Sequence, residues 1–174
     1  MTEKTVTCSI RISKEIYEAL QKEAKERDES FNTMVNQILR FETEFIAPGR
    51  KVGAQAISRA TWNALLDSMS EESLAQAGTE AGTKGPRDFV VAKMGQMNLE
   101  NLIDFIEIFG KYGLAWEYNK TEYGGGMSIV LSHVLGKKYS QFLASYFGAA
   151  FGSMGLKPDI TASDASVIIN LQST

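Results

Sequence analysis

Few side chains in this sequence of 174 residues could carry covalent or metal chemistry. It holds one histidine, His133, and one cysteine, Cys8, so a single chain cannot assemble a multi-thiolate or multi-histidine metal site. A catalytic nucleophile needs a base and an orienting acid, and the sole histidine has no identifiable partner of this kind. Haem would find only His133 as a nitrogen ligand. We therefore expect no enzyme activity, no metal and no cofactor.

Hydrogen-bonding side chains recur instead at every second position near the N-terminus. The polar set consists of Thr5, Thr7, Ser9 and Arg11. The apolar set between them consists of Val6, Cys8, Ile10 and Ile12. This period of two predicts a half-buried strand over residues 5–12, with Cys8 as a small buried side chain rather than a redox sensor.

Two amphipathic helices are predicted directly after this strand. Ser13 suits the N-cap of a helix that runs to about Arg27, and Ser30 suits the N-cap of a second one. Asp28, between them, can adopt the left-handed conformation more easily than most residues. The expected buried positions are Ile16, Ala19, Leu20, Ala24, Phe31, Met34, Val35, Ile38 and Leu39.

A unit of one strand and two helices is too small to bury much apolar surface, and a lone strand leaves its backbone groups unpaired. Pairing with a second copy solves both problems, because two antiparallel strands form a ribbon and four helices then close one shared core. The sequence therefore favours a homodimer.

Residues 5–45 resemble the ribbon-helix-helix DNA-binding proteins of the Arc, MetJ and CopG type. The resemblance rests on the alternation ending in Arg11-Ile12-Ser13 and on Ser30-Phe31-Asn32-Thr33 at the start of the second helix. It implies that the ribbon of the dimer enters the major groove of DNA. It assigns base contacts to Thr7, Ser9 and Arg11, and phosphate contacts to Ser30, Asn32 and Thr33.

The charge balance opposes DNA binding. The whole chain carries a net charge of −3, and residues 1–45 hold seven basic and nine acidic side chains. DNA binding usually depends on Lys and Arg near phosphates, although the backbone N–H groups of a helix N-terminus can also hold an anion. We therefore expect binding that is weak for each dimer and strengthened by further assembly.

We expect three segments: the module at 1–46, a linker at 47–52 around Pro48-Gly49, and an α+β domain at 53–174 with helices packed on a small antiparallel sheet. The glycines and Pro86 within 78–86 are expected to break or loosen a helix that opens at Ser70. The expected strands are 52–57, 114–118, 127–132, 157–161 and 166–171. The other expected helices are 58–69, 98 to about 113, and 136–154.

The second region is weakly similar to ligand-binding domains of the vinyl-reductase and haem-nitric-oxide-sensor type. His133 and Trp116 are candidate contacts for a small apolar ligand, although a lone histidine is more often structural. Aromatic side chains at strand and helix spacing lie more often in the hydrophobic core than in a ligand pocket. The region's role, either oligomerisation beyond the dimer, for example to a tetramer, or sensing of an effector, stays open.

The function expected from these observations is that of a homodimeric transcriptional regulator, such as a repressor. Two alternatives stay open: an antitoxin-like protein that binds DNA and a protein partner, and an adaptor dimer that binds no DNA. The N-terminus lacks the basic flank and apolar stretch of a signal peptide, and no run of eighteen apolar residues occurs. We therefore expect a cytoplasmic protein without a membrane partner.

Overall fold

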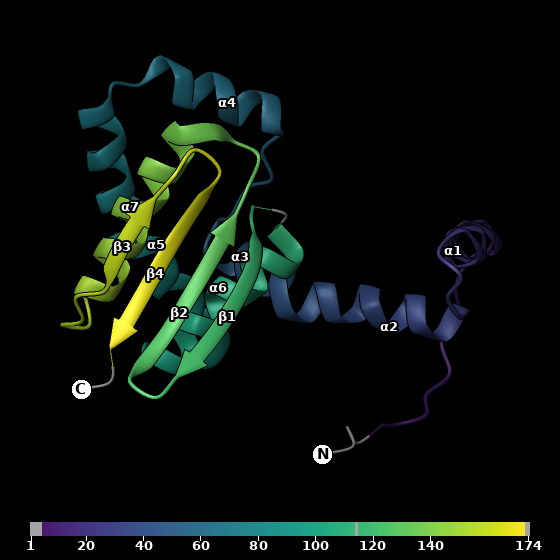
Figure 1. The fold of residues 1–174 in the computed structure, drawn as a ribbon. Coiled ribbons are helices and arrows are strands. Elements are labelled where there is room, and N and C mark those ends of the chain that lie inside the picture. Colours follow the sequence, from purple (N-terminus) through teal and green to yellow (C-terminus); the bar gives the residue numbers. More distant parts are fainter. Residues whose placement is uncertain (1–4, 114, 173–174) are drawn as a thin grey trace. The chain divides into compact units, whose positions relative to one another are not determined.

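The structure is a computed structural model that describes residues 5–113 and 115–172 (Figure 1). The chain divides into two compact units, Met1–Glu42 and Thr43–Thr174. The described residues form helices and a four-stranded antiparallel sheet, which confirms the expected α+β class.

The N-terminal unit contains two helices, α1 (Lys14–Glu26) and α2 (Phe31–Phe41). Each begins at the predicted cap, because the Ser13 hydroxyl accepts from the Ile16 N–H at 3.3 Å and the Ser30 hydroxyl accepts from the Thr33 N–H at 3.0 Å. Asp28 joins them with a φ of 55°, the left-handed conformation that its short polar side chain tolerates.

Residues 5–13 form neither helix nor strand in the single chain. Several apolar side chains that the ribbon dimer is expected to bury are exposed in the single chain: Cys8 and Ala19 are exposed, and Val6, Ile10 and Ile16 have exposed fractions of 90%, 60% and 54%. The physical reason is that two short helices enclose little volume, so only Ala24 and Met34 are buried among residues 5–42.

The C-terminal unit begins within helical backbone. A π-helical segment, η1 (Glu42–Ile46), runs into α3 (Ala47–Lys51), where Pro48 occupies the first turn and is buried. Proline is tolerated there because the first-turn N–H groups have no intrahelical acceptor. The expected loss of helix around Pro48-Gly49 is thus not found, and the expected strand over 52–57 is absent, since these residues are exposed turn and coil.

The sheet has the strand order β1-β2-β4-β3, formed by β1 (Glu117–Tyr123), β2 (Gly126–Ser132), β3 (Asp159–Ala162) and β4 (Ser166–Gln172). Every neighbouring pair is antiparallel. Alternate residues of the central strands point to the core, where Ile129 is the register partner of Ile169 and Leu131 that of Val167. β2, β3 and β4 lie close to the predicted positions. β1 overlaps the predicted strand 114–118 only at residues 117 and 118 and continues to Tyr123, so most of the expected connection at 119–126 is strand.

Helices cover one face of this sheet (Figure 1). α6 (Leu99–Gly113) packs against β1, and α7 (Gly136–Gly152) packs against β3 and β4. α5 (Glu71–Met94) packs against both α6 and α7, and α4 (Arg59–Ser68) contacts α7. The predicted starts of these helices are confirmed: Ser58 and Ser70 cap α4 and α5, and the Asn98 side chain accepts from the Asn101 N–H at the start of α6.

The predicted break of the helix at 78–86 is wrong, because α5 is continuous through Pro86. Gly78, Gly82 and Pro86 recur every four residues and are all buried. A Cβ atom on Gly82 would lie 2.0 Å from the Tyr146 carbonyl oxygen, and one on Gly78 would lie 2.6 Å from that of Phe142. The small residues thus let α5 approach the backbone of α7 closely, and this packing outweighs their low helix propensity.

None of the helices in the described part of the chain has the length and apolar character needed to cross a membrane.

Candidate nucleic-acid interface

The three side chains predicted to contact bases lie on one exposed segment. Thr7, Ser9 and Arg11 belong to residues 5–13, all of which are exposed in the single chain. Their alternation with apolar residues places the two kinds of side chain on opposite sides only if the backbone becomes a strand. A strand here requires a neighbour that supplies hydrogen-bond partners, and the described single chain has none paired with these residues.

The predicted phosphate contacts lie at the N-terminus of α2. The Ser30 hydroxyl lies 2.8 Å from the Thr33 hydroxyl and also caps the Thr33 N–H, so both side chains are used partly within the turn. The Asn32 side chain is exposed. The first backbone N–H groups of the helix, those of Phe31 and Asn32, have no intrahelical acceptor and carry the positive end of the helix dipole.

Acidic residues next to this helix end reduce its attraction for an anion. Asp28 is exposed two residues before the cap. Glu29 is half buried, and its carboxylate accepts from the Gln37 side chain at 3.0 Å, while its second carboxylate oxygen is buried and accepts no hydrogen bond from the described residues. The Phe31 ring packs against Tyr17 at 5.0 Å between centroids, so it belongs to the contact between α1 and α2.

His133 lies in the C-terminal unit as a buried structural residue. Its Nδ1 accepts from the Leu135 N–H at 3.3 Å, which leaves the proton on Nε2, 2.8 Å from the Ser140 hydroxyl oxygen. Nε2 therefore donates to Ser140 and cannot take its proton. Because Ser140 has no exposed surface, this pair lacks both the base and the access that a nucleophilic serine needs.

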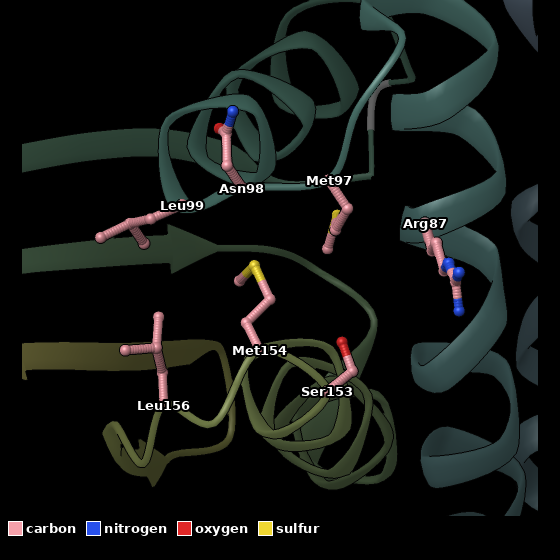
Figure 2. Close-up of a pocket in the computed structure, with 7 residues that line it drawn as sticks. All are labelled: Arg87, Met97, Asn98, Leu99, Ser153, Met154 and Leu156. Atoms are coloured by element: carbon pink, nitrogen blue, oxygen red, sulfur yellow. The ribbon is translucent and has the colours of Figure 1, made fainter.

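Trp116 also belongs to the core. Its indole N–H donates to the Ile106 carbonyl oxygen at 3.1 Å, and its ring packs edge-on against Phe147 at 5.5 Å. Neither His133 nor Trp116 lines the cleft drawn in Figure 2. The structure thus brings neither candidate ligand contact to that open site, and the aromatic residues around them form a packed cluster.

Acidification is expected to destabilise the C-terminal unit through His133. Burial lowers the pKa of His133 below the usual value of about 6.5. Between the folded and unfolded pKa values the unfolded chain binds more protons, so the stability present above pH 6.5 is lost as the pH falls through this interval.

Urea unfolding of the wild type and His133→Gln between pH 8 and pH 5 measures this loss. The wild type should lose more unfolding free energy than the variant below about pH 6.5. Equal losses would contradict the assignment. The titration is simple to follow by NMR, since the chain has one histidine.

The sequence interpretation missed two features of the C-terminal unit. The Lys138 ammonium group donates to the carbonyl oxygens of Leu66, Asp67 and Met69 at 2.9 to 3.1 Å, which caps the end of α4. The cleft of Figure 2 collects residues from three distant segments. Neither could be found from spacing, because the partners lie tens of residues apart in the chain.

Within residues 5–113 and 115–172, no group of three or more His, Cys, Asp or Glu side chains is placed to hold a metal ion. No known protein-family model matches the sequence, and a search of curated proteins finds no match either.

Proposed function

We propose that this chain is a homodimeric, sequence-specific DNA-binding regulator of transcription that reads the major groove with a two-stranded ribbon. The observation that carries the proposal is the exposed segment 5–12, in which polar and apolar side chains alternate directly before two capped helices. This segment has the pattern of a strand, and no strand among the described residues of its own chain pairs with it.

Exposed apolar surface supports a second copy as that partner. Along with Val6, Ile10 and Ile16, the α2 residues Ile38 and Leu39 have exposed fractions of 42% and 54%. Their burial would remove apolar area from water at about 25 cal/mol per Å². An antiparallel pair of strands related by a two-fold axis would satisfy both backbones and bring four helices around the apolar side of the ribbon.

The polar side of the same ribbon would face DNA. Arg11 can bond to the O6 and N7 atoms of guanine, while the Thr7 and Ser9 hydroxyls can donate or accept and the Thr7 methyl can contact thymine. The N–H groups at the start of α2, with Ser30, Asn32 and Thr33, would hold a backbone phosphate and so set the register. Asp28 and Glu29 keep each contact weak, so assembly of dimers through the C-terminal unit would raise the overall affinity.

In this function the chain binds DNA and catalyses no reaction. The geometry of His133 and Ser140 supports this assignment, because the imidazole already donates to the hydroxyl group. The C-terminal unit would then act in oligomerisation or in sensing an effector.

Selection of bound sequences from a pool of random duplex DNA tests the function. The full chain is expected to enrich a short inverted repeat, since a two-fold dimer presents the same side chains to both half-sites. The spacing of repeated sites would report the assembly of dimers. Recovery of DNA without any sequence enrichment, or of none at all, would contradict the proposal and favour an adaptor dimer.

A further inference from the structure

The C-terminal unit has an open cleft where three segments meet: α5, the residues that lead into α6, and the end of α7 with the loop that follows (Figure 2). Its volume is about 550 Å³. Clefts of roughly 300–1,000 Å³ commonly hold small organic ligands. The space is therefore adequate for one small molecule.

The inner wall of the cleft is apolar. Met97 and Met154 point toward each other across it, and Leu99 and Leu156 lie beside them (Figure 2). All four side chains are half buried and pack against the hydrophobic core. Methionine adapts its shape because it is unbranched and has three rotatable bonds, so this wall suits an apolar body without demanding one shape.

The polar part of the cleft contains one cation, Arg87. Arg87 is exposed, and no ion pair or hydrogen bond engages its guanidinium group within the described chain. The Asn98 side-chain carbonyl oxygen accepts from the Asn101 N–H at 2.8 Å, and in Figure 2 this side chain extends away from Met97 and Met154. The Ser153 hydroxyl donates to the Ala150 carbonyl oxygen at 2.7 Å. None of the described residues that line the cleft is acidic.

A second hollow on the same unit differs in charge. It is lined by Glu44, Asp104 and Glu107 together with Lys93 and Lys111, so its acidic residues outnumber its basic ones. The chain as a whole is also negative. Compared with this second hollow, the cleft presents an anion with the Arg87 cation and, among its described lining residues, with no carboxylate.

We propose that this cleft binds a small amphiphilic organic anion, with the apolar body between Met97 and Met154 and the anionic group on Arg87. A carboxylate would accept two N–H bonds from the guanidinium group, the geometry that arginine presents to planar anions. The site does not depend on DNA binding by the N-terminal unit. If both proposals hold, this anion is the effector of the regulator.

Binding of octanoate to the full chain tests this site, with 1-octanol as a neutral probe of the same length. The protein carries ¹³C-labelled methionine methyl groups, and NMR follows the signals of Met97 and Met154 among its seven methionines. Octanoate should shift both signals in a saturable way. Octanol should need about tenfold higher concentration, because it lacks the charge that Arg87 recognises.

Two variants separate charge recognition from general apolar binding. Arg87→Gln should weaken octanoate binding about tenfold and leave octanol unchanged, as expected for the loss of a charge-assisted hydrogen bond. The control Arg59→Gln removes an exposed arginine on α4 that does not line the cleft, and should change neither. Equal affinity for octanoate and octanol, equal affinity of Arg87→Gln and wild type for octanoate, or shifts confined to other methionines would each overturn the proposal. DNA takes no part in these readouts, so they are independent of the proposed function.

Discussion

Replacing Arg11 with alanine is expected to reduce the preference for the selected DNA site over random DNA by about 100-fold. A bidentate contact between arginine and guanine discriminates against the wrong base by about 1–3 kcal/mol, and a dimer contains two such arginines. The exposed position of Arg11 means that its loss should leave the fold of α1 and α2 intact.

Fluorescence polarisation with labelled DNA at one fixed salt concentration measures this preference, since affinities change steeply with salt. Lys22→Ala is a matched control, because Lys22 is an exposed cation of the same unit that lies 3.8 Å from Glu26 on α1. The control should keep its preference. Base reading by Arg11 would be contradicted if Arg11→Ala kept the full preference for the selected site over random DNA. It would also be contradicted if Lys22→Ala lost as much of this preference as Arg11→Ala.

Gly82→Ala is expected to lower the unfolding free energy of the C-terminal unit by about 3 kcal/mol, a large part of the 5–15 kcal/mol typical of whole proteins. The new Cβ atom would lie 2.0 Å from the Tyr146 carbonyl oxygen and 2.6 Å from its carbon. Backbone atoms cannot rotate away as a side chain can, so α5 and α7 must separate. Urea unfolding followed by circular dichroism measures the loss.

Gly148→Ala on α7 is the matched control for this prediction. Its Cβ atom would meet only the Ile160 Cδ1 atom, at an ordinary 3.9 Å, and alanine favours helix over glycine by about 0.5–1 kcal/mol. This variant should be slightly more stable than the wild type. If Gly82→Ala were as stable as the wild type, the close approach of α5 to α7 would be refuted.

Local features of the sequence predicted most of the elements. Ser13, Ser30, Ser58 and Ser70 each begin a helix where expected, because an N-cap bonds to an amide three residues away. The antiparallel sheet was also expected, from short apolar segments separated by turn residues. Such interactions depend on neighbours in the chain, so they are visible without the fold.

Features set by tertiary contacts were not predictable in this way. In the sequence alone, Gly78, Gly82 and Pro86 indicate a helix break. In the structure they lie within a continuous α5, because they allow its close approach to α7. Glycine at i and i+4 is the one signal that could have indicated close helix packing. Arg87, Met97 and Met154 meet only through the packing of α5, α6 and α7, so the cleft had no sequence signal.

The N-terminal segment differs from both cases. Its alternation predicts a strand, but no strand can form at residues 5–12 without a neighbour, and the single chain leaves these residues exposed. Cys8 illustrates the consequence, since its burial was predicted from a ribbon that requires two copies. The expected burial of the apolar side chains in this segment is therefore a prediction about the dimer.

Amide hydrogen exchange of residues 5–12, measured by NMR on the full chain, tests the ribbon most directly. In a two-stranded antiparallel ribbon, alternate N–H groups point at the partner strand, so we expect every second amide of this segment to be protected and the protection to be lost on dilution to monomer. Uniformly fast exchange throughout residues 5–12 at concentrations where the chain is dimeric would contradict the account.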